Sequence, residues 1–351
     1  MPGLLTSPSF PNDVPIAPLH VIDYQLLVRG DAEEMDNLFQ AARELGFWYL
    51  KNHGTEEDAQ RMFSTFGGTL DLPLAEKMLY EQGDSGNSFG YKAKGKIVTD
   101  KNGTLDCSEF FNVAQDDALS WPTVIHRDYP ATITSRMQDV VTPFVRKSRD
   151  INFLLLSVFE HKLGLPRGDL WKLHPSTGTC GGEARCVKTP PNAQQAGIGA
   201  HSDFGTLSLV HNRLGGLQVM QPGSDKWLYI KPLPGHIVCN VGDALAIFSG
   251  GILRSCVHRV MPPPGEQARY ARHSVAFFTR PGDQIPLRHL SERSKMVSDS
   301  VSQAPPGQYE PGATAGEWTS RRIRSLRLKS RAGWLASQGT EHSSGVQSQT
   351  H

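Results

Sequence analysis

The sequence contains no long uninterrupted run of apolar residues, and its few cysteines show no paired spacing. The longest apolar stretch, residues 153–159, is far shorter than the roughly 20 residues that a helix needs to cross a bilayer. The five cysteines are scattered and include no Cys-x-x-Cys pair, which is typical of a reducing compartment and argues against a disulfide framework. Residues 1–18 contain several prolines and lack the basic start and apolar core of a signal peptide. We therefore expect a cytoplasmic protein that makes no use of a membrane.

The sequence also has no excess of positive or negative charge. The formal net charge is +1, so no overall field attracts nucleic acid or an anionic surface. No basic groove with interleaved aromatic residues accompanies the candidate site below, so we expect a small-molecule partner and no nucleic acid. With 351 residues and 38% apolar content, the chain can bury a large core. Its length suggests about two domains, although a β-barrel of this size can be a single one. We expect a monomer.

Three residues are candidate metal ligands. His201 and Asp203 form a His-x-Asp pair, and His258 follows after a gap long enough for several strands. Two imidazoles and one carboxylate are the ligand set of a non-haem iron(II) site, where they leave one face of the metal open for O₂ and a co-substrate. A structural zinc site would use four protein ligands, usually with thiolates among them. The short pattern alone is weak evidence, because a lone histidine is most often a hydrogen-bonded core residue.

The flanking sequence favours the metal site. Residues 204–210 form an apolar, β-branched run that predicts a strand leaving the site. Residues 272–278 predict another strand, in which Arg272 and Ser274 are two positions apart and therefore face the same way. A guanidinium beside a hydroxyl is a clamp for a carboxylate, which arginine can bind through two parallel hydrogen bonds. The triad and this clamp together are far more specific than either one alone.

Periodicity divides the rest of the chain. An apolar stripe predicts a helix that ends at Gly46, and a long helical pattern covers residues 131–164. From about residue 185 to residue 280 the pattern changes to short apolar runs separated by Gly, Pro and Asp, which indicates an all-β core. The basic stretch at residues 321–331, with six cations, is interpreted as a solvated helix that packs Ile323 and Leu326 inward.

Motifs along most of the chain resemble those of one enzyme family. Residues 46–54 (GFWYLKNHG) and 72–78 (LPLAEKM) resemble its N-terminal signature, and residues 108–111, 215–219 and 240–243 follow in family order. Together with the triad and the clamp, they resemble the isopenicillin N synthase-like branch of the iron(II)/2-oxoglutarate-dependent dioxygenases. The motifs are specific for the fold and the metal, and they say little about the substrate.

The resemblance implies a mainly β fold with flanking helices. Its core would be a double-stranded β-helix (jelly roll) of two antiparallel sheets, with the metal between them and helices packed outside one sheet. The implied division is an N-terminal non-haem dioxygenase region (1–130), a helical support (131–180), the Fe(II)/2-oxoglutarate dioxygenase core (181–285), a C-terminal helical segment (286–337) and a disordered tail (338–351).

The resemblance also implies the roles of the site residues. His201, Asp203 and His258 would bind Fe(II). The co-substrate 2-oxoglutarate would chelate the metal, with its distal carboxylate held by Arg272 and Ser274. The second co-substrate is O₂, and ascorbate is a further candidate reductant. The implied enzyme is an oxidoreductase that hydroxylates, desaturates or rearranges a small organic molecule, in secondary metabolism.

By the same resemblance, aromatic residues line the substrate pocket: Phe89, Tyr91, Phe110, Phe111, Phe204 and Phe278. Phe110 and Phe111 are equally compatible with positions in the core. The sequence departs from the family before His-x-Asp, where Val187 and Thr189 stand at the places of the usual Asn and Tyr. Thr189 offers a shorter hydroxyl and is a candidate contact of 2-oxoglutarate.

Two alternatives stay open on the sequence alone. An oxidase of the isopenicillin N synthase or ethylene-forming type shares the triad and the Arg-x-Ser clamp, but takes its electrons from its substrate or from ascorbate. The missing tyrosine is the reason to retain this alternative. The other alternative is a metal-binding module without turnover, although an inactive copy has no physical reason to keep an open coordination face.

Overall fold

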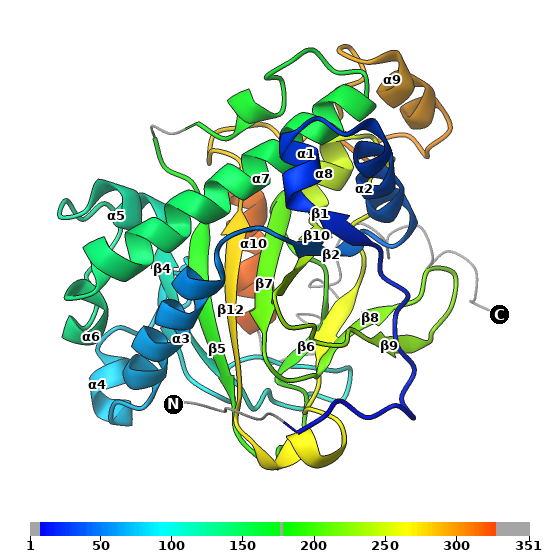
Figure 1. Ribbon diagram of the computed structural model, residues 1–351. Helices are drawn as coiled ribbons and strands as arrows, with labels where there is room; N and C mark the ends of the chain where they lie inside the picture. Colours follow the sequence, from blue (N-terminus) through cyan, green and yellow to red (C-terminus); the bar gives the residue numbers. More distant parts are fainter. Residues whose placement is uncertain (1–7, 176–177, 328–351) are drawn as a thin grey trace.

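Two β-sheets face each other at the centre of the molecule, and helices cover the outer face of the larger one (Figure 1). The computed structural model describes residues 8–175 and 178–327, so the tail predicted at 338–351 lies outside the described residues. In the large sheet the strand order is β1-β2-β10-β7-β12-β5-β4-β3, and in the small sheet it is β6-β11-β8-β9. All strand pairs are antiparallel except β1 with β2.

The strands of the large sheet are β1 (Val21–Asp23), β2 (Phe47–Lys51), β3 (Gly90–Lys92), β4 (Glu109–Ala114), β5 (Glu183–Thr189), β7 (Leu207–Asn212), β10 (His236–Val241) and β12 (Arg272–Thr279). Those of the small sheet are β6 (Ile198–His201), β8 (Leu217–Met220), β9 (Trp227–Tyr229) and β11 (His258–Val260). Strands β5 to β12 occupy the region that the sequence pattern predicts to be the β core, whereas β1 to β4 come from the N-terminal part of the chain and extend the large sheet.

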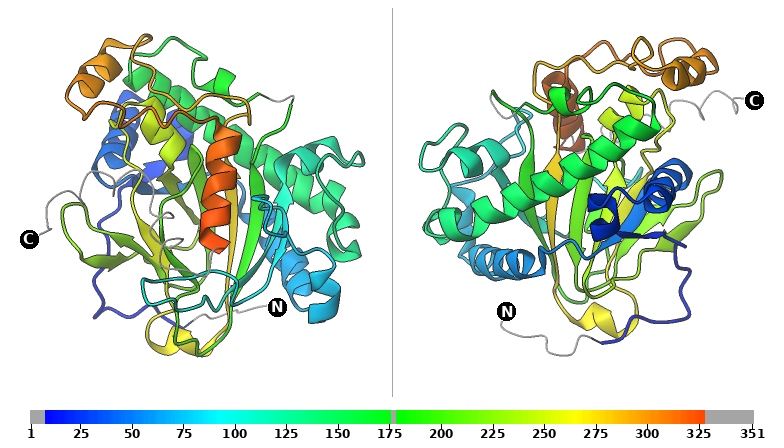
Figure 2. Two further views of the ribbon diagram at one scale, coloured as in Figure 1. Left: turned by 180° about the vertical axis from the view of Figure 1, so that it is seen from behind. Right: turned by 45° about the horizontal axis from the view of Figure 1, so that its top comes forward.

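The α-helices are α1 (Tyr24–Val28), α2 (Ala32–Glu44), α3 (Glu56–Leu70), α4 (Leu74–Met78), α5 (Gln115–Ser120), α6 (Ala131–Thr134), α7 (Thr142–Lys162), α8 (Asp243–Phe248), α9 (Lys295–Ser302) and α10 (Ala315–Arg327). Helix α7 crosses the outer face of the large sheet, and α10 lies on the opposite side of that sheet (Figures 1 and 2). Among the described residues, no helix combines the length and the apolar character that a membrane span requires.

Strand β12 shows how the sequence assigns residues to the two faces of the large sheet. Val275 and Phe277 are fully buried in the main core, which the helices and the outer face of the sheet share. Because neighbouring side chains on a strand point to opposite faces, Ser274 and Phe278 point into the space between the two sheets. The outer face therefore provides stability, and the inner face carries the candidate site.

Local residue choices set the ends of the helices. Helix α2 begins where the Asp31 side chain accepts a hydrogen bond from the backbone N–H of Glu34 (2.9 Å). It ends before Gly46, which has a φ of 72° and would place a Cβ only 2.0 Å from the carbonyl oxygen of Arg254. The predicted stop is thus confirmed, and only glycine fits there.

The helical pattern predicted over residues 131–164 is divided into three pieces. Helices α6 and α7 are separated by a π-helical segment, η1 (Met137–Val141), and Pro143 lies in the first turn of α7. Proline has no backbone N–H for the hydrogen bond of a continuous helix, so the regular helix starts again at this point. Helix α7 ends at Lys162, just before Gly164, whose φ is 66°.

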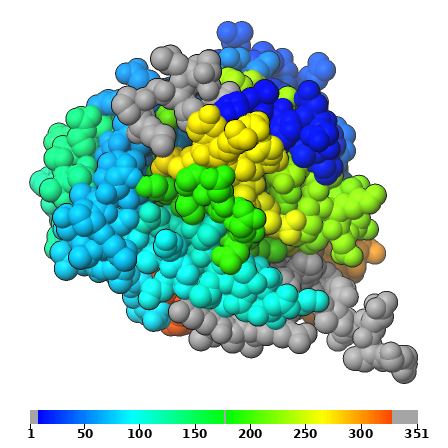
Figure 3. Space-filling view, turned by 90° about the horizontal axis from the view of Figure 1, so that it is seen from below, coloured from blue at the N-terminus to red at the C-terminus, as the bar shows by residue number. Residues whose placement is uncertain are grey.

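The space between the sheets contains a smaller apolar cluster of residues from both sheets, including Phe47, Val219 and Val238. Loops close one end of this space. The backbone N–H of Cys107 donates to Ala196 (3.2 Å), and that of Asn192 donates to Ala268 (2.7 Å) in the 3₁₀ turn η3 (Gly265–Arg269). Figure 3 shows these segments, cyan, green and yellow, as neighbours on the lower face of the molecule.

Candidate metal centre and substrate pocket

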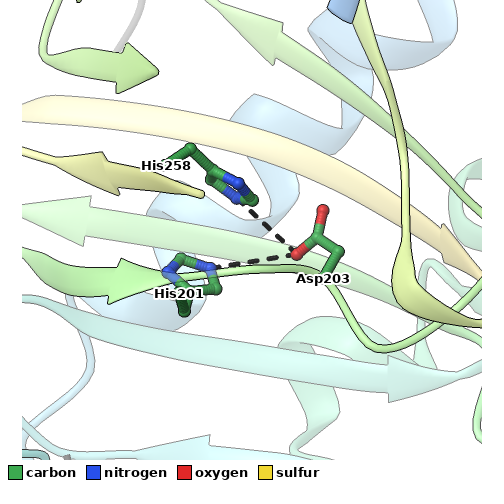
Figure 4. A group of neighbouring side chains, drawn as sticks. All are labelled: His201, Asp203 and His258. Atoms are coloured by element: carbon green, nitrogen blue, oxygen red, sulfur yellow. Dashed lines mark ion pairs between the residues drawn. The ribbon is translucent and has the colours of Figure 1, made fainter. Parts of the chain in front are cut away.

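His201, Asp203 and His258 come together between the two sheets (Figure 4). His201 ends β6, His258 begins β11, and the two residues are direct partners across this antiparallel pair. Oδ1 of Asp203, in the turn after β6, is 3.8 Å from Nε2 of His201 and 3.7 Å from Nε2 of His258. Among the described residues, this is the only group of at least three His, Cys, Asp or Glu side chains whose ligand atoms lie within 4.8 Å of one another.

Backbone carbonyls fix the orientation of both imidazoles. Nδ1 of His201 is 2.8 Å from the carbonyl oxygen of Gly199, and Nδ1 of His258 is 3.1 Å from that of Cys256. A carbonyl oxygen can only accept, so Nδ1 carries the proton in both rings. Each Nε2 therefore presents its lone pair to the centre of the triad, as a metal ligand must.

The carboxylate of Asp203 is held from behind. Its Oδ2 accepts hydrogen bonds from Ser208 Oγ (2.6 Å) and Asn240 Nδ2 (2.8 Å), which leaves Oδ1 turned toward the imidazoles. Burial raises the pKa of Asp203, but the two imidazoles and these hydrogen bonds outweigh burial and lower the pKa to about 2. Burial and the neighbouring His258 lower the pKa of His201 to about 3. At neutral pH the carboxylate is ionised and the His201 imidazole is neutral, the states in which they bind metals.

Arg322 connects helix α10 both to α8, through a buried ion pair, and to the segment that carries His201 and Asp203, through a hydrogen bond. Nη1 of Arg322 donates to Oδ2 of Asp243 (2.6 Å), and its Nη2 donates to the carbonyl oxygen of Ser202 (3.3 Å). Ser255 Oγ donates to the other oxygen of Asp243 (2.8 Å). Ser202 lies between the first two triad residues, so α10 is tied to the segment that presents them.

This network corrects the interpretation of the basic stretch. Arg322 is only 3% exposed, so the prediction of a solvated face is wrong at this residue. A partner carboxylate on α8 makes its burial tolerable, and sequence periodicity cannot show such a partner. Ile323 and Leu326 do point inward, toward the pocket described below.

Arg272 and Ser274 lie on the same face of β12, as the alternation predicts. Nη1 of Arg272 donates to Ser274 Oγ (3.2 Å), Nε to the carbonyl oxygen of Gly215 (2.7 Å), and Nη2 to Oδ1 of Asn212 (2.8 Å). Arg272 is 1% exposed, and burial lowers its pKa to about 10, so it remains a cation at neutral pH. Among the described residues it has no carboxylate partner. A buried cation without a counter-ion suits an anionic ligand.

Thr189 lies opposite Arg272 in the register of β5 and β12. Its side chain is fully buried, and its hydroxyl pairs with that of Ser108 at 2.7 Å. Val187, the other departure from the family pattern, is buried in a small apolar cluster. The structure thus gives the Thr189 hydroxyl a partner within the protein and does not join it to the pair formed by Arg272 and Ser274.

A narrow cavity of about 60 Å³ adjoins the triad. Its apolar walls are Ile97, Val98, Phe110, Ile198, Phe204, Phe278, Ile323 and Leu326. The cavity is lined by His201 and Asp203, and by side chains of α10 on one side.

Three of the six aromatic residues predicted for the pocket, Phe110, Phe204 and Phe278, line this cavity. The structure corrects the placement of the other three. Phe111 is the next residue along β4 after Phe110 and must point to the other face, where it packs in the main core with Tyr91. Phe89 lies beside His126, at a ring distance of 4.6 Å, in a neighbouring cleft.

The sequence analysis did not identify the residues that hold Asp203 and Arg272 in place. Ser208 and Asn212 both lie on β7 at the positions that face the space between the sheets, and a period-two count along this strand would have found them. Asn240 belongs to a motif that was recognised in the sequence, but only the fold shows its contact with Asp203.

Comparisons with known proteins agree with this geometry. The model of the 2OG-Fe(II) oxygenase superfamily matches residues 184–281, and that of the N-terminal region of non-haem dioxygenases in morphine synthesis matches residues 19–132. A 2-oxoglutarate-dependent dioxygenase of Aspergillus fumigatus is 26% identical over 359 aligned positions, which cover 93% of this chain and 90% of that protein.

Solved structures show the same fold. A full-length protein of Neurospora crassa, solved in complex with alpha-KG, matches with a TM-score of 0.71 at 20% identity, over 89% of this chain and 98% of that chain. A 2OG-Fe(II) oxygenase family protein from Caulobacter crescentus matches with a TM-score of 0.72 at 22% identity, over 88% and 99%. These likenesses confirm the predicted jelly-roll core. The chain belongs to the iron(II)/2-oxoglutarate-dependent dioxygenases, oxidoreductases that use Fe(II), 2-oxoglutarate and O₂.

Proposed function

We propose that His201, Asp203 and His258 hold the Fe(II) at which this enzyme oxidises a small organic molecule. The observation that carries the proposal is the convergence of two imidazole Nε2 atoms and one carboxylate oxygen, each oriented by the protein. Bound Fe(II) and 2-oxoglutarate supply the activation of O₂, and the protein supplies ligands, orientation and exclusion of water.

The triad residues have separate tasks. The hydrogen bonds from Nδ1 to backbone carbonyls keep His201 and His258 in the tautomer that offers Nε2. Ser208 and Asn240 engage one oxygen of Asp203, which favours one-point binding through the other. Three ligands on one side leave the opposite side of the metal free for co-substrate and O₂.

The proposed role of Arg272 and Ser274 is to hold the distal carboxylate of 2-oxoglutarate. The guanidinium is cationic, buried and without a carboxylate partner among the described residues, and the Ser274 hydroxyl lies beside it at 3.2 Å. A dicarboxylate that reaches this clamp compensates its charge in a site of low dielectric constant, where charge-assisted hydrogen bonds are strong.

The pocket beside the triad is the proposed place of the organic substrate. Its largely apolar walls exclude water from the oxidised carbon and set which position faces the metal. Hydroxylation, desaturation and ring rearrangement are all within reach of this arrangement. We propose a role in secondary metabolism.

We also propose that the enzyme works as a monomer in the cytoplasm. None of the five cysteines, all of which lie in the described part of the chain, forms a disulfide bond, and four of them are buried. The triad, the clamp and the pocket all come from a single chain.

The assignment of the ligands can be tested by metal titration without O₂, in wild type and in the His201→Ala, Asp203→Ala and His258→Ala variants. We expect each variant to keep its fold and to lose more than about 100-fold in Fe(II) affinity, since even the loss of an outer-shell partner costs roughly 10–100-fold.

His211→Gln is the matched control, because His211 is also a buried histidine, on the helix-covered face of the large sheet, where it packs against Phe144. It should bind Fe(II) as the wild type does. Wild-type affinity in an alanine variant of the triad would contradict the proposal.

A further inference from the structure

Three arginines line the pocket next to the triad: Arg185, Arg280 and Arg327. Among the described residues that line it, the only carboxylate is that of Asp203 in the triad. Arg327, at the end of α10, forms ion pairs with Glu81 and Asp84. The charge of Arg327 is therefore compensated from outside the pocket, and this compensation does not extend to Arg185 and Arg280.

Arg185 offers a donor to the pocket. Its guanidinium lies between the rings of Phe110 and Phe278, at 4.4 and 4.8 Å from their centroids. Nε donates to Oδ1 of Asn112 (2.9 Å), and Nη2 donates to Oε1 of Glu183 (2.7 Å). Nη1 has no hydrogen-bond partner among the described residues. The protein thus fixes the guanidinium by two of its nitrogens and leaves the third available to a ligand.

The local charges do not balance. Oε1 of the fully buried Glu183 accepts from both Arg185 and Arg280, so one negative charge serves two positive charges. Lys92, behind Phe110, does not change this count, because it is paired with Asp106. Burial lowers the pKa of Arg185, Glu183 opposes this effect, and the nearby Arg280 lowers the pKa further. A partly buried surplus of positive charge is compensated best by an anion.

The clamp for 2-oxoglutarate is too far away to provide that anion. In the register of β5 and β12, Arg185 lies opposite Ala276, four residues along the strand from Arg272, which is about 13 Å. The guanidinium of Arg185 lies between Phe110, which is on the Arg272 side of it in the register, and Phe278, which is on the far side, so it is not drawn toward Arg272. One short dicarboxylate cannot serve both guanidinium groups.

We propose that the organic substrate carries a carboxylate on an apolar body, and that Nη1 of Arg185 binds this carboxylate. The inference rests on the proposed function of the site and adds the chemical class of its substrate. The apolar body matches the aliphatic and aromatic walls of the pocket, and the acid group matches Nη1 of Arg185, the nitrogen that the protein leaves unengaged on this guanidinium. Arg185 would then select the substrate and set the distance between the acid group and the oxidised carbon.

The proposal predicts a preference for acids over their neutral derivatives. A charge-assisted hydrogen bond from arginine is about twice as strong as one between neutral groups, and the apolar surroundings strengthen it. An acid should therefore bind at least about tenfold more tightly than its methyl ester, a difference of ~1.4 kcal/mol.

The test uses the full chain with Fe(II) and 2-oxoglutarate, under nitrogen, in calorimetric titrations. The probes are decanoate, 3-phenylpropanoate and 1-naphthylacetate, each beside its own methyl ester. We expect at least one acid to bind the wild type and to exceed its ester by about tenfold or more. If no acid binds, or if acids and esters bind equally, the proposal is overturned without the need of any variant.

Variants test whether Arg185 is the residue responsible for the preference for acids over esters. Arg185→Gln should abolish it, and Arg185→Lys should keep part of it, because the charge is retained without the planar guanidinium. Arg213→Gln is the matched control: Arg213 also lies over an aromatic ring, Phe63 at 4.1 Å, and also bonds to a side-chain amide, that of Gln60, but outside this pocket.

The control should keep the full preference, and an undiminished preference in a folded Arg185→Gln variant would overturn the proposal. If Arg185→Gln does not fold, the proposal is still tested by Arg185→Lys and by the comparison of acids with esters in the wild type. A wild type that does not bind 2-oxoglutarate contradicts the proposed function instead. A wild type that binds 2-oxoglutarate without preferring acids contradicts only this inference.

Discussion

Arg272→Ala should weaken the binding of 2-oxoglutarate by at least about tenfold and barely change the affinity for Fe(II). Arg272 is 1% exposed, and its nitrogens donate only to neutral acceptors on Gly215, Ser274 and Asn212. A hydrogen bond to a charged group contributes roughly 1.5–3 kcal/mol, and ~1.4 kcal/mol corresponds to a factor of ten. A carboxylate left buried without its cation adds to the loss.

A graded series separates charge from geometry. Arg272→Lys should recover only part of the affinity, because an ammonium cannot form two parallel hydrogen bonds with a carboxylate. Ser274→Ala removes one hydrogen bond to the carboxylate but leaves the cation in place, so affinity should fall less than in Arg272→Ala. The assay is titration of 2-oxoglutarate into metal-loaded protein without O₂. The melting temperature of each variant is measured in parallel, because Arg272 also binds the backbone at Gly215.

One result would refute this reasoning. If Arg272→Ala leaves the affinity for 2-oxoglutarate unchanged and instead raises the KM of the organic substrate, Arg272 holds the carboxylate of that substrate. The clamp would then have been assigned to the wrong ligand, and an oxidase that takes its electrons from the substrate would explain the Arg-x-Ser pair.

Two further predictions concern stability. Arg322→Leu should lower the free energy of unfolding by about 3–5 kcal/mol, because Asp243 loses the partner of its buried charge. Adding Asp243→Asn should recover part of this loss, whereas Arg321→Leu, at the exposed neighbour, should cost less than about 0.5 kcal/mol in urea denaturation; equal losses at both arginines would contradict the account. Burial lowers the pKa of His174 from 6.5 to about 4, so between these values the unfolded chain binds a proton that the folded chain does not. The contribution of His174 to stability should be complete above about pH 6.5 and should fall by on the order of 3 kcal/mol as the pH drops to about 4. His174→Gln should reduce this pH dependence, and an unaltered slope between pH 7 and pH 4 would show that His174 is not its source.

The triad and the clamp could be predicted because their chemistry is local in sequence. His201 and Asp203 stand in one short motif, and Arg272 and Ser274 are two positions apart on one strand, so alternation alone places them on one face. The second histidine needed more than periodicity. Only its place in a series of family motifs connected His258 with the other two ligands.

Other features depend on register, which the sequence does not specify. Alternation says that only one of Phe110 and Phe111 faces the pocket, but not which one. The choice follows from the pairing of β4 with β5, which puts Phe110 opposite Val187 on the inner face. Arg185 could be found by counting in twos from Val187, but its free donor depends on contacts with residues far away in the sequence.

The burial of Arg322 likewise depends on a distant partner. A run of basic residues indicates a solvated helix, since charged side chains are rarely buried without compensation. Asp243, on α8, supplies the compensation through a contact 79 residues distant in sequence. Patterns of charge and hydrophobicity along α10 contain no trace of this contact.

The central claim is that this chain couples O₂ consumption at a His-Asp-His iron site to the conversion of 2-oxoglutarate. Its most direct test is the consumption of O₂ by the purified protein with and without Fe(II) and 2-oxoglutarate, with succinate quantified at the same time. The account predicts O₂ uptake only when both are supplied, with succinate formed in equimolar amount, and no turnover in Asp203→Ala. Uptake of O₂ without 2-oxoglutarate, or without the formation of succinate, would contradict it.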